Sequence, residues 1–81
     1  MPMVEMIVEM GYFVTISKRS VKIEDVSIDS KILIYIDNDG SPLAEQYGRT
    51  TIVKCAGSNK VEDKIRVALV EFVKWYNMQQ R

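Results

Sequence analysis

The chain has 81 residues, of which 47% are hydrophobic and 27% charged, with eleven basic and eleven acidic side chains and no histidine. A chain this short buries only ~60% of its unfolded surface, so we expect one domain over residues 1–81 with a single modest core. The lack of histidine excludes Ser–His and Cys–His nucleophile pairs, imidazole bases and the usual zinc ligands, and with them most familiar enzyme mechanisms.

Cys55 is the only cysteine, which rules out an internal disulfide and fits a reducing compartment. With no histidine to activate it, we expect an inert thiol in the core. No apolar run approaches the ~20 residues that span a bilayer. Glu5 and Glu9 stand where a signal peptide has lysines and an unbroken apolar segment. We therefore expect a cytoplasmic protein.

The first predicted elements are strands. Apolar residues recur at every second position of residues 3–16, which is the period of a strand. Gly11 interrupts this pattern and predicts a bulge or a tight turn between two short strands. The alternating apolar residues are Val4, Met6, Val8, Met10, Tyr12, Val14 and Ile16.

The next segment changes phase. Val21 and Ile23 alternate in one phase and Val26 and Ile28 in the other, so we expect a turn or bulge near residues 24–25. Residues 31–36 form a near-continuous apolar run rich in β-branched side chains. Such a run predicts a central strand covered on both faces.

Residues 41–48 have the pattern of a very short helix, with Ser41 as N-cap, Pro42 at the first helical position and Gly48 just past the end. A structured loop is the alternative. Residues 49–55, which include two threonines and two β-branched aliphatic residues, predict a further strand.

The last predicted element is a helix from about residue 60 to about residue 78. Asn59 is its expected N-cap, Glu62 its capping-box partner, and Arg66 the partner of Glu62 in an i,i+4 ion pair. At about 100° per residue one broad apolar face emerges. It comprises Val61, Ile65, Ala68, Leu69, Phe72, Val73, Trp75 and Tyr76.

These elements predict an α+β fold. We expect a mostly antiparallel sheet of about four to five strands, with the long C-terminal helix packed on one face. The strand order does not follow from the pattern.

One short motif suggests chemistry. A hydrophobic strand followed by Asp37-Asn38-Asp39-Gly40 resembles the first motif of the haloacid-dehalogenase-like phosphohydrolases. The resemblance implies a nucleophile at Asp37, an acid/base at Asp39 and a bound magnesium ion. That family also needs a clamping lysine and an acidic pair on later strands, whereas only one helix follows Ser58. We therefore interpret the loop as a turn and expect no catalytic residue, metal or cofactor.

The leading candidate surface lies on the C-terminal helix. Val67 and Val70 fall away from the predicted core face, among the basic residues Lys64, Arg66 and Lys74. A helix that is apolar on a second side often packs against a partner, and a small domain gains stability from that contact. We therefore expect a non-enzymatic interaction module that forms a homodimer or docks onto a protein.

Two alternatives use the same chain differently. The basic side chains Lys64, Arg66 and Lys74 could neutralise nucleic-acid phosphates, although a net charge of zero argues against a dedicated nucleic-acid domain. The third hypothesis is magnesium-dependent phosphoryl chemistry at Asp37 and Asp39.

Overall fold

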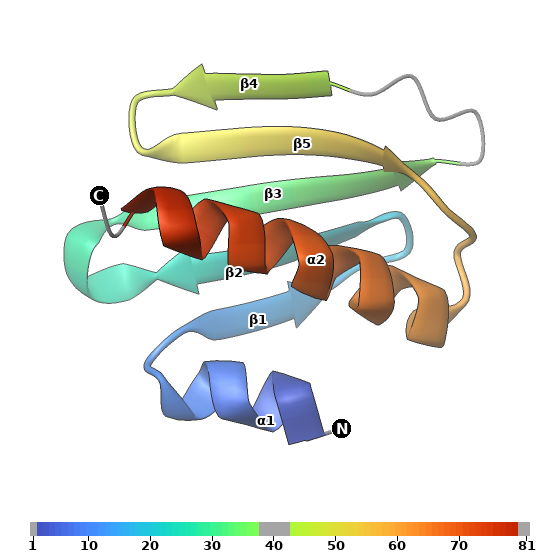
Figure 1. The fold of residues 1–81 in the computed structure, drawn as a ribbon, viewed down its shortest axis with the longest axis horizontal. Coiled ribbons are helices and arrows are strands. Elements are labelled where there is room, and N and C mark those ends of the chain that lie inside the picture. Colours follow the sequence, from blue (N-terminus) through green and yellow to red (C-terminus); the bar gives the residue numbers. More distant parts are fainter. Residues whose placement is uncertain (1, 38–42, 80–81) are drawn as a thin grey trace.

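The computed structural model describes residues 2–37 and 43–79, which form two α-helices on one side of a five-stranded sheet (Figure 1). The strand order across the sheet is β1-β2-β3-β5-β4. The elements in chain order are α1 (Pro2–Glu9), β1 (Phe13–Ile16), β2 (Ser20–Asp25), the 3-10 helix η1 (Val26–Ile28), β3 (Ser30–Asp37), β4 (Leu43–Tyr47), β5 (Thr50–Ala56) and α2 (Val61–Gln79).

The sheet is mostly antiparallel, as predicted. β1, β2 and β3 form an antiparallel meander, and β4 pairs with β5 in an antiparallel hairpin. The hairpin joins the meander through β5, which runs parallel to β3. With the long C-terminal helix on one face, this arrangement confirms the α+β class.

The predicted interruption after β2 is also confirmed. The chain leaves the sheet at Asp25, whose side chain accepts a hydrogen bond from the backbone N–H of Ser27 at 3.2 Å. It returns at Asp29, which adopts the left-handed conformation with φ 51°. Aspartate tolerates this conformation better than most residues, so the sequence suits the turn.

The short helix predicted for residues 41–48 is wrong where the structure describes this segment, because residues 43–47 form strand β4. Tyr47 pairs with Thr50, so Gly48 and Arg49 make a two-residue hairpin loop. Gly48 has φ 59°, which suits glycine at the first position of a type II′ turn. The predicted N-cap Ser41 and the predicted first helical residue Pro42 lie outside the described residues.

The strand predicted at the N-terminus is wrong for residues 2–9, which form helix α1. Val4 and Ile7 lie one turn apart and contact a cavity of only about 10 Å³ shared with Val14 of β1 and Leu69 of α2. Ile7 is 2% exposed, so α1 docks through one apolar stripe. The chain becomes extended only at Phe13, after the turn at Gly11.

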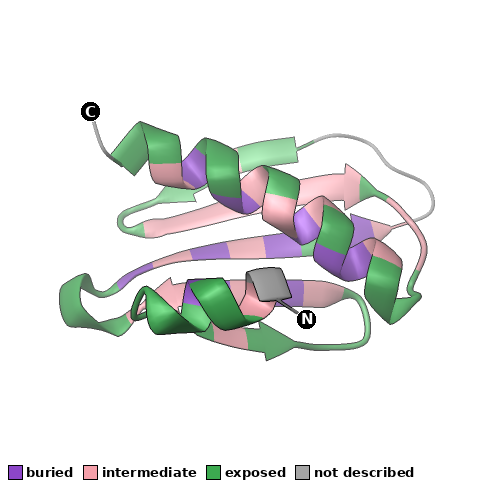
Figure 2. Cartoon of the chain, turned by 60° about the horizontal axis from the view of Figure 1, so that its bottom comes forward, coloured by how far each residue is buried: buried purple, intermediate pink, exposed green. Residues whose placement is uncertain are grey.

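The core lies between the helices and one face of the sheet. Ile32, Ile34 and Ile36 of β3 are each at most 4% exposed, and they cluster with apolar side chains of both helices. Tyr35, between them, is 44% exposed. The expectation that residues 31–36 are covered on both faces is therefore wrong. Buried and less buried positions instead alternate along the central strands (Figure 2).

Helix α2 crosses the sheet and supplies the rest of the core. Ile65, Ala68, Phe72 and Trp75 are buried, as the apolar face predicts, and Phe72 packs edge-on against the Tyr12 ring at a centroid distance of 5.2 Å. The prediction that Val61 and Val73 belong to this buried face is wrong, because both side chains are about half exposed.

The N-terminus of α2 is bonded differently from the prediction. Ser58, rather than Asn59, accepts a hydrogen bond from the backbone N–H of Lys60, at 3.4 Å. The Ser58 hydroxyl donates to Asp63 at 2.6 Å.

Neither helix in residues 2–37 and 43–79 is long and apolar enough to cross a membrane.

Truncating Phe72 to alanine should lower the free energy of unfolding by about 3–5 kcal/mol, because a buried aromatic side chain leaves a cavity when removed. Val73→Ala on the same helix is the matched control and should cost less than about 1 kcal/mol, since Val73 is half exposed. Urea unfolding midpoints measure both changes. Equal losses in the two variants would contradict the assigned orientation of α2.

Candidate functional site

The second apolar side predicted on α2, which consists of Val67 and Val70, does not form one exposed surface. Val70 is 51% exposed, as expected. Val67 is partly buried and packs against the core cluster, so its placement at the centre of an exposed surface is wrong. Of the two valines, Val70 alone is therefore exposed on this side of α2.

Lys64 was predicted to lie on the solvent side of α2, and this prediction is wrong. The residue is only 5% exposed. Its ammonium group donates hydrogen bonds to the backbone carbonyls of Ser17 and Lys18, at 2.8 and 3.1 Å. Lys64 therefore ties α2 to the turn between β1 and β2 and does not form part of an exposed basic patch.

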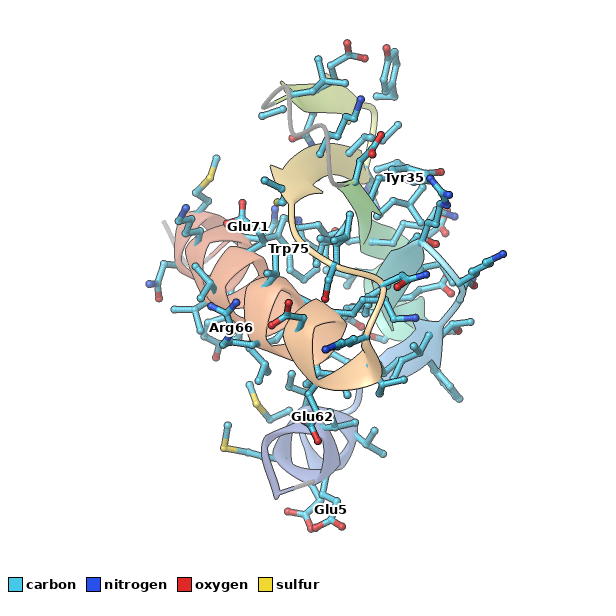
Figure 3. All side chains as sticks on the ribbon, turned by 90° about the vertical axis from the view of Figure 1, so that its right-hand side faces the viewer. Glu5, Tyr35, Glu62, Arg66, Glu71 and Trp75 are labelled. Atoms are coloured by element: carbon cyan, nitrogen blue, oxygen red, sulfur yellow. The ribbon has the colours of Figure 1, made fainter. Side chains whose placement is uncertain are left out.

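The other two basic residues of the predicted patch are exposed but engaged. Arg66 pairs with Asp63 at 3.2 Å, in place of the expected pair with Glu62, and Lys74 pairs with Glu71 at 3.1 Å. Figure 3 shows Arg66 on the side of α2 that faces away from the sheet. The positive charge that α2 offers to a phosphate backbone is therefore largely matched by carboxylates.

The acidic loop is described only at its start. Asp37 ends β3 beside the parallel strand β5, and its carboxylate lies 3.8 Å from the Lys54 ammonium group. Its carbonyl accepts a hydrogen bond from the backbone N–H of Gly57 at 3.2 Å. Asp39 lies outside the described residues, and within them no three side chains of the metal-binding types gather around one point.

Ser58, which precedes the last helix, is engaged at the start of α2. Its hydroxyl bond to Asp63 is the main reason that the pKa of the Asp63 carboxyl is lowered, and the pair with Arg66 acts in the same direction. The bond orders the turn between β5 and α2. On this geometry Ser58 has a structural role.

Cys55 points to the helix-covered side of β5 and packs against the core. Burial raises the pKa of its thiol, and the nearby Glu71 carboxylate adds to this effect. The thiol is therefore protonated at neutral pH, which agrees with the expectation of an inert side chain.

The side of the sheet opposite both helices is a surface that the sequence analysis did not identify, and we call it the open face. The strand register shows which side chains share it, because directly paired residues point to the same side. Tyr35 marks this side in Figure 3, across the sheet from α2. The open face comprises Phe13, Thr15, Ser20, Lys22, Glu24, Lys31, Leu33, Tyr35, Asp37, Leu43, Glu45, Tyr47, Thr50, Ile52, Lys54 and Ala56.

The centre of the open face is apolar. Leu33 of β3 pairs with Ile52 of β5, and Tyr35 and Leu43, which are 44% and 42% exposed, lie in the next row. A hollow of about 380 Å³ opens between these strands, and Arg19 reaches its border. Apolar centres of this kind, ringed by polar side chains, are typical of protein interfaces.

The charges of the open face balance. Its strands carry the acids Glu24, Asp37 and Glu45 together with the same number of lysines, and two of the lysines sit at 3.8 Å from an acid of their own chain, in the pairs Lys22–Glu24 and Lys54–Asp37. Glu45 also accepts a hydrogen bond from the Tyr47 hydroxyl, which raises the pKa of that tyrosine. The strands of the face therefore carry no excess of one sign, and Arg19 at the border of the hollow adds one positive charge.

A signal for this face was present in the sequence. Within the apolar run of residues 31–36, the positions of Lys31 and Tyr35 are in one phase and the three isoleucines in the other. A strand covered on both faces has no reason to place lysine and tyrosine in the same phase. The mixed character of that phase indicates a strand with one open side.

Comparison of the chain with models of protein families, with curated proteins and with solved structures finds no match. The candidate function therefore depends on the geometry of the chain itself.

Replacing Lys64 with methionine should destabilise the fold by roughly 1.5–3 kcal/mol, because two carbonyls lose a charged donor while the apolar stem is kept. Lys18→Met is the matched control: Lys18 is exposed and contributes only its carbonyl, so its change should stay within about 0.5 kcal/mol. Chemical denaturation measures both. An unchanged midpoint for the Lys64 variant would contradict the buried role.

The bond between Ser58 and Asp63 should make stability depend on pH. Because folding lowers the pKa of Asp63 below its ordinary value of 3.8, the stabilisation is complete above that value and is lost as pH falls through the folded pKa. Asp63→Asn should therefore be less stable than the wild type at about pH 6, and the difference should shrink towards about pH 2. Glu62→Gln, which removes a carboxylate from the same turn but leaves the Ser58 bond, should show a smaller pH-dependent difference. A constant gap between wild type and Asp63→Asn across this range would count against the assignment.

Proposed function

We propose that the protein is a small non-enzymatic interaction module that associates with a second copy of itself, and that the open face of the sheet is its contact surface. The observation that carries this proposal is the pairing of Leu33 with Ile52 beside the exposed Tyr35, on a sheet face that neither helix covers. Tyrosine is enriched among the residues that dominate binding energy at interfaces.

The size of the open face supports association. The sheet lies in the plane of the two longer dimensions of the molecule, 33 and 28 Å (Figure 1). The face of a five-stranded sheet in that plane is of the same order as the ~800 Å² that each partner buries in a standard interface. A domain this small also gains from covering apolar surface that its own helices leave exposed.

Charge favours a protein over a nucleic acid as the occupant. The open face balances its lysines with carboxylates, and the basic residues of α2 are paired or buried. Nucleic-acid sites instead concentrate positive charge.

We also propose a cytoplasmic location, because Cys55 is a free thiol and burial keeps it protonated, which fits a reducing compartment.

Molar mass measured by light scattering over a range of concentrations tests the proposal. The wild type should reach the mass of a dimer, and Tyr35→Thr should weaken the dimer by at least about tenfold, because threonine keeps the β propensity while the ring is lost. Val70→Thr makes a similar change on the exposed side of α2 and should leave association unchanged.

A wild type that is monomeric at every concentration would contradict self-association. A dimer weakened by Val70→Thr but not by Tyr35→Thr would place the contact on α2 instead. Salt-sensitive binding of a labelled single-stranded oligonucleotide, lost in Tyr35→Thr, would assign the open face to nucleic acid.

A further inference from the structure

The charge pattern of the open face restricts how two copies can meet on it. Two identical sheets that stack face to face are related by a two-fold axis lying between them, and this axis decides which residues oppose each other. Opposing like charges disfavour an arrangement, whereas opposing unlike charges steer and fix it. The register of the strands shows which residues a given axis would bring together.

Two simple axes bring like charges together. An axis along β3 places Lys31 opposite its own copy, because a residue on the axis meets itself. An axis at right angles to the strands through Leu33 places both Lys22 and Glu45 opposite their own copies, since all three lie in one row across the sheet.

A third axis, parallel to the strands and midway between β3 and β5, avoids this conflict. It exchanges β3 with β5 and β2 with β4, so that Leu33 meets the partner's Ile52 at the centre. In the same row Lys22 meets the partner's Glu45, and symmetry repeats this contact on the other side.

The neighbouring rows are also compatible with this axis. Tyr35 meets the partner's Lys54, a cation facing an aromatic ring. Glu24 meets the partner's Tyr47, a neutral side chain. No like charges oppose each other among the paired positions of these four strands.

We infer that two copies of this chain stack by their open faces about a two-fold axis that runs along the strands between β3 and β5, with Lys22 of each copy against Glu45 of the other. This arrangement rests on the proposed function and specifies which residues of the two copies oppose each other. The two sheets form an aligned sandwich, and the helices of each copy lie on its outer sides.

Charge reversal at the two positions tests the arrangement. Lys22→Glu alone sets two carboxylates against each other at this contact, and Glu45→Lys alone sets two ammonium groups against each other, so each variant should raise the dimer dissociation constant by about 10- to 100-fold. An equimolar mixture of the two variants should restore association, because like charges meet only when two copies of the same variant pair.

 Like-charge contacts of that kind belong to the two homodimers. In the mixed dimer one copy presents carboxylates at both positions and the other presents ammonium groups, so both contacts join unlike charges. Sedimentation velocity measures the three samples, and circular dichroism verifies that each variant is folded.

Lys74→Glu is the matched control, because it reverses the same charge on α2, where the side chain is 67% exposed. It should leave the dissociation constant unchanged. Single variants that dimerise like the wild type, or weakened variants that the mixture does not restore, would overturn the arrangement while leaving self-association intact. A wild type that never dimerises would overturn the proposed function as well.

Discussion

The alternation of side chains along β3 is the constraint on which the rest of the structure depends. Ile32, Ile34 and Ile36 point to one side, where both helices cover them. Because neighbouring residues of a strand face opposite sides, Leu33 and Tyr35 must point to the other. The same strand therefore creates the core and the open face together, and a change of register by one residue would exchange them.

The two α-helices in the described part of the chain cover only one side of this sheet. Helix α1 docks beside β1 through Ile7, and α2 crosses the central strands and is tied to the β1–β2 turn by Lys64. The opposite side keeps an apolar centre bordered by balanced charges. A second copy can cover that centre without an excess of either sign, which a phosphate backbone cannot do.

Much of the fold could be predicted from periodicity, because β1, β2, β3, β5 and the helix α2 have regular apolar patterns, whereas β4 was not predicted as a strand. The failures came where one signal fits two structures. Val4 and Ile7 belong to an apolar segment that satisfies both a strand and a helix, and only packing decides between them. Gly48 provides a positive φ that ends a helix as readily as it turns a hairpin. The prediction for Val67 failed because a helical wheel cannot show which neighbouring segments approach the helix, and here Gly57, in the connection between β5 and α2, lies close to the Val67 side chain.

The most direct test of the open face as a contact surface is an isotope-filtered nuclear Overhauser experiment on a mixture of labelled and unlabelled chains. Such a filter reports only contacts between different copies. Cross-peaks between the methyl groups of Leu33 in one copy and Ile52 in the other are the expected result. Cross-peaks that instead connect Val70 to its surroundings in another copy, with none from the open face, would contradict the account.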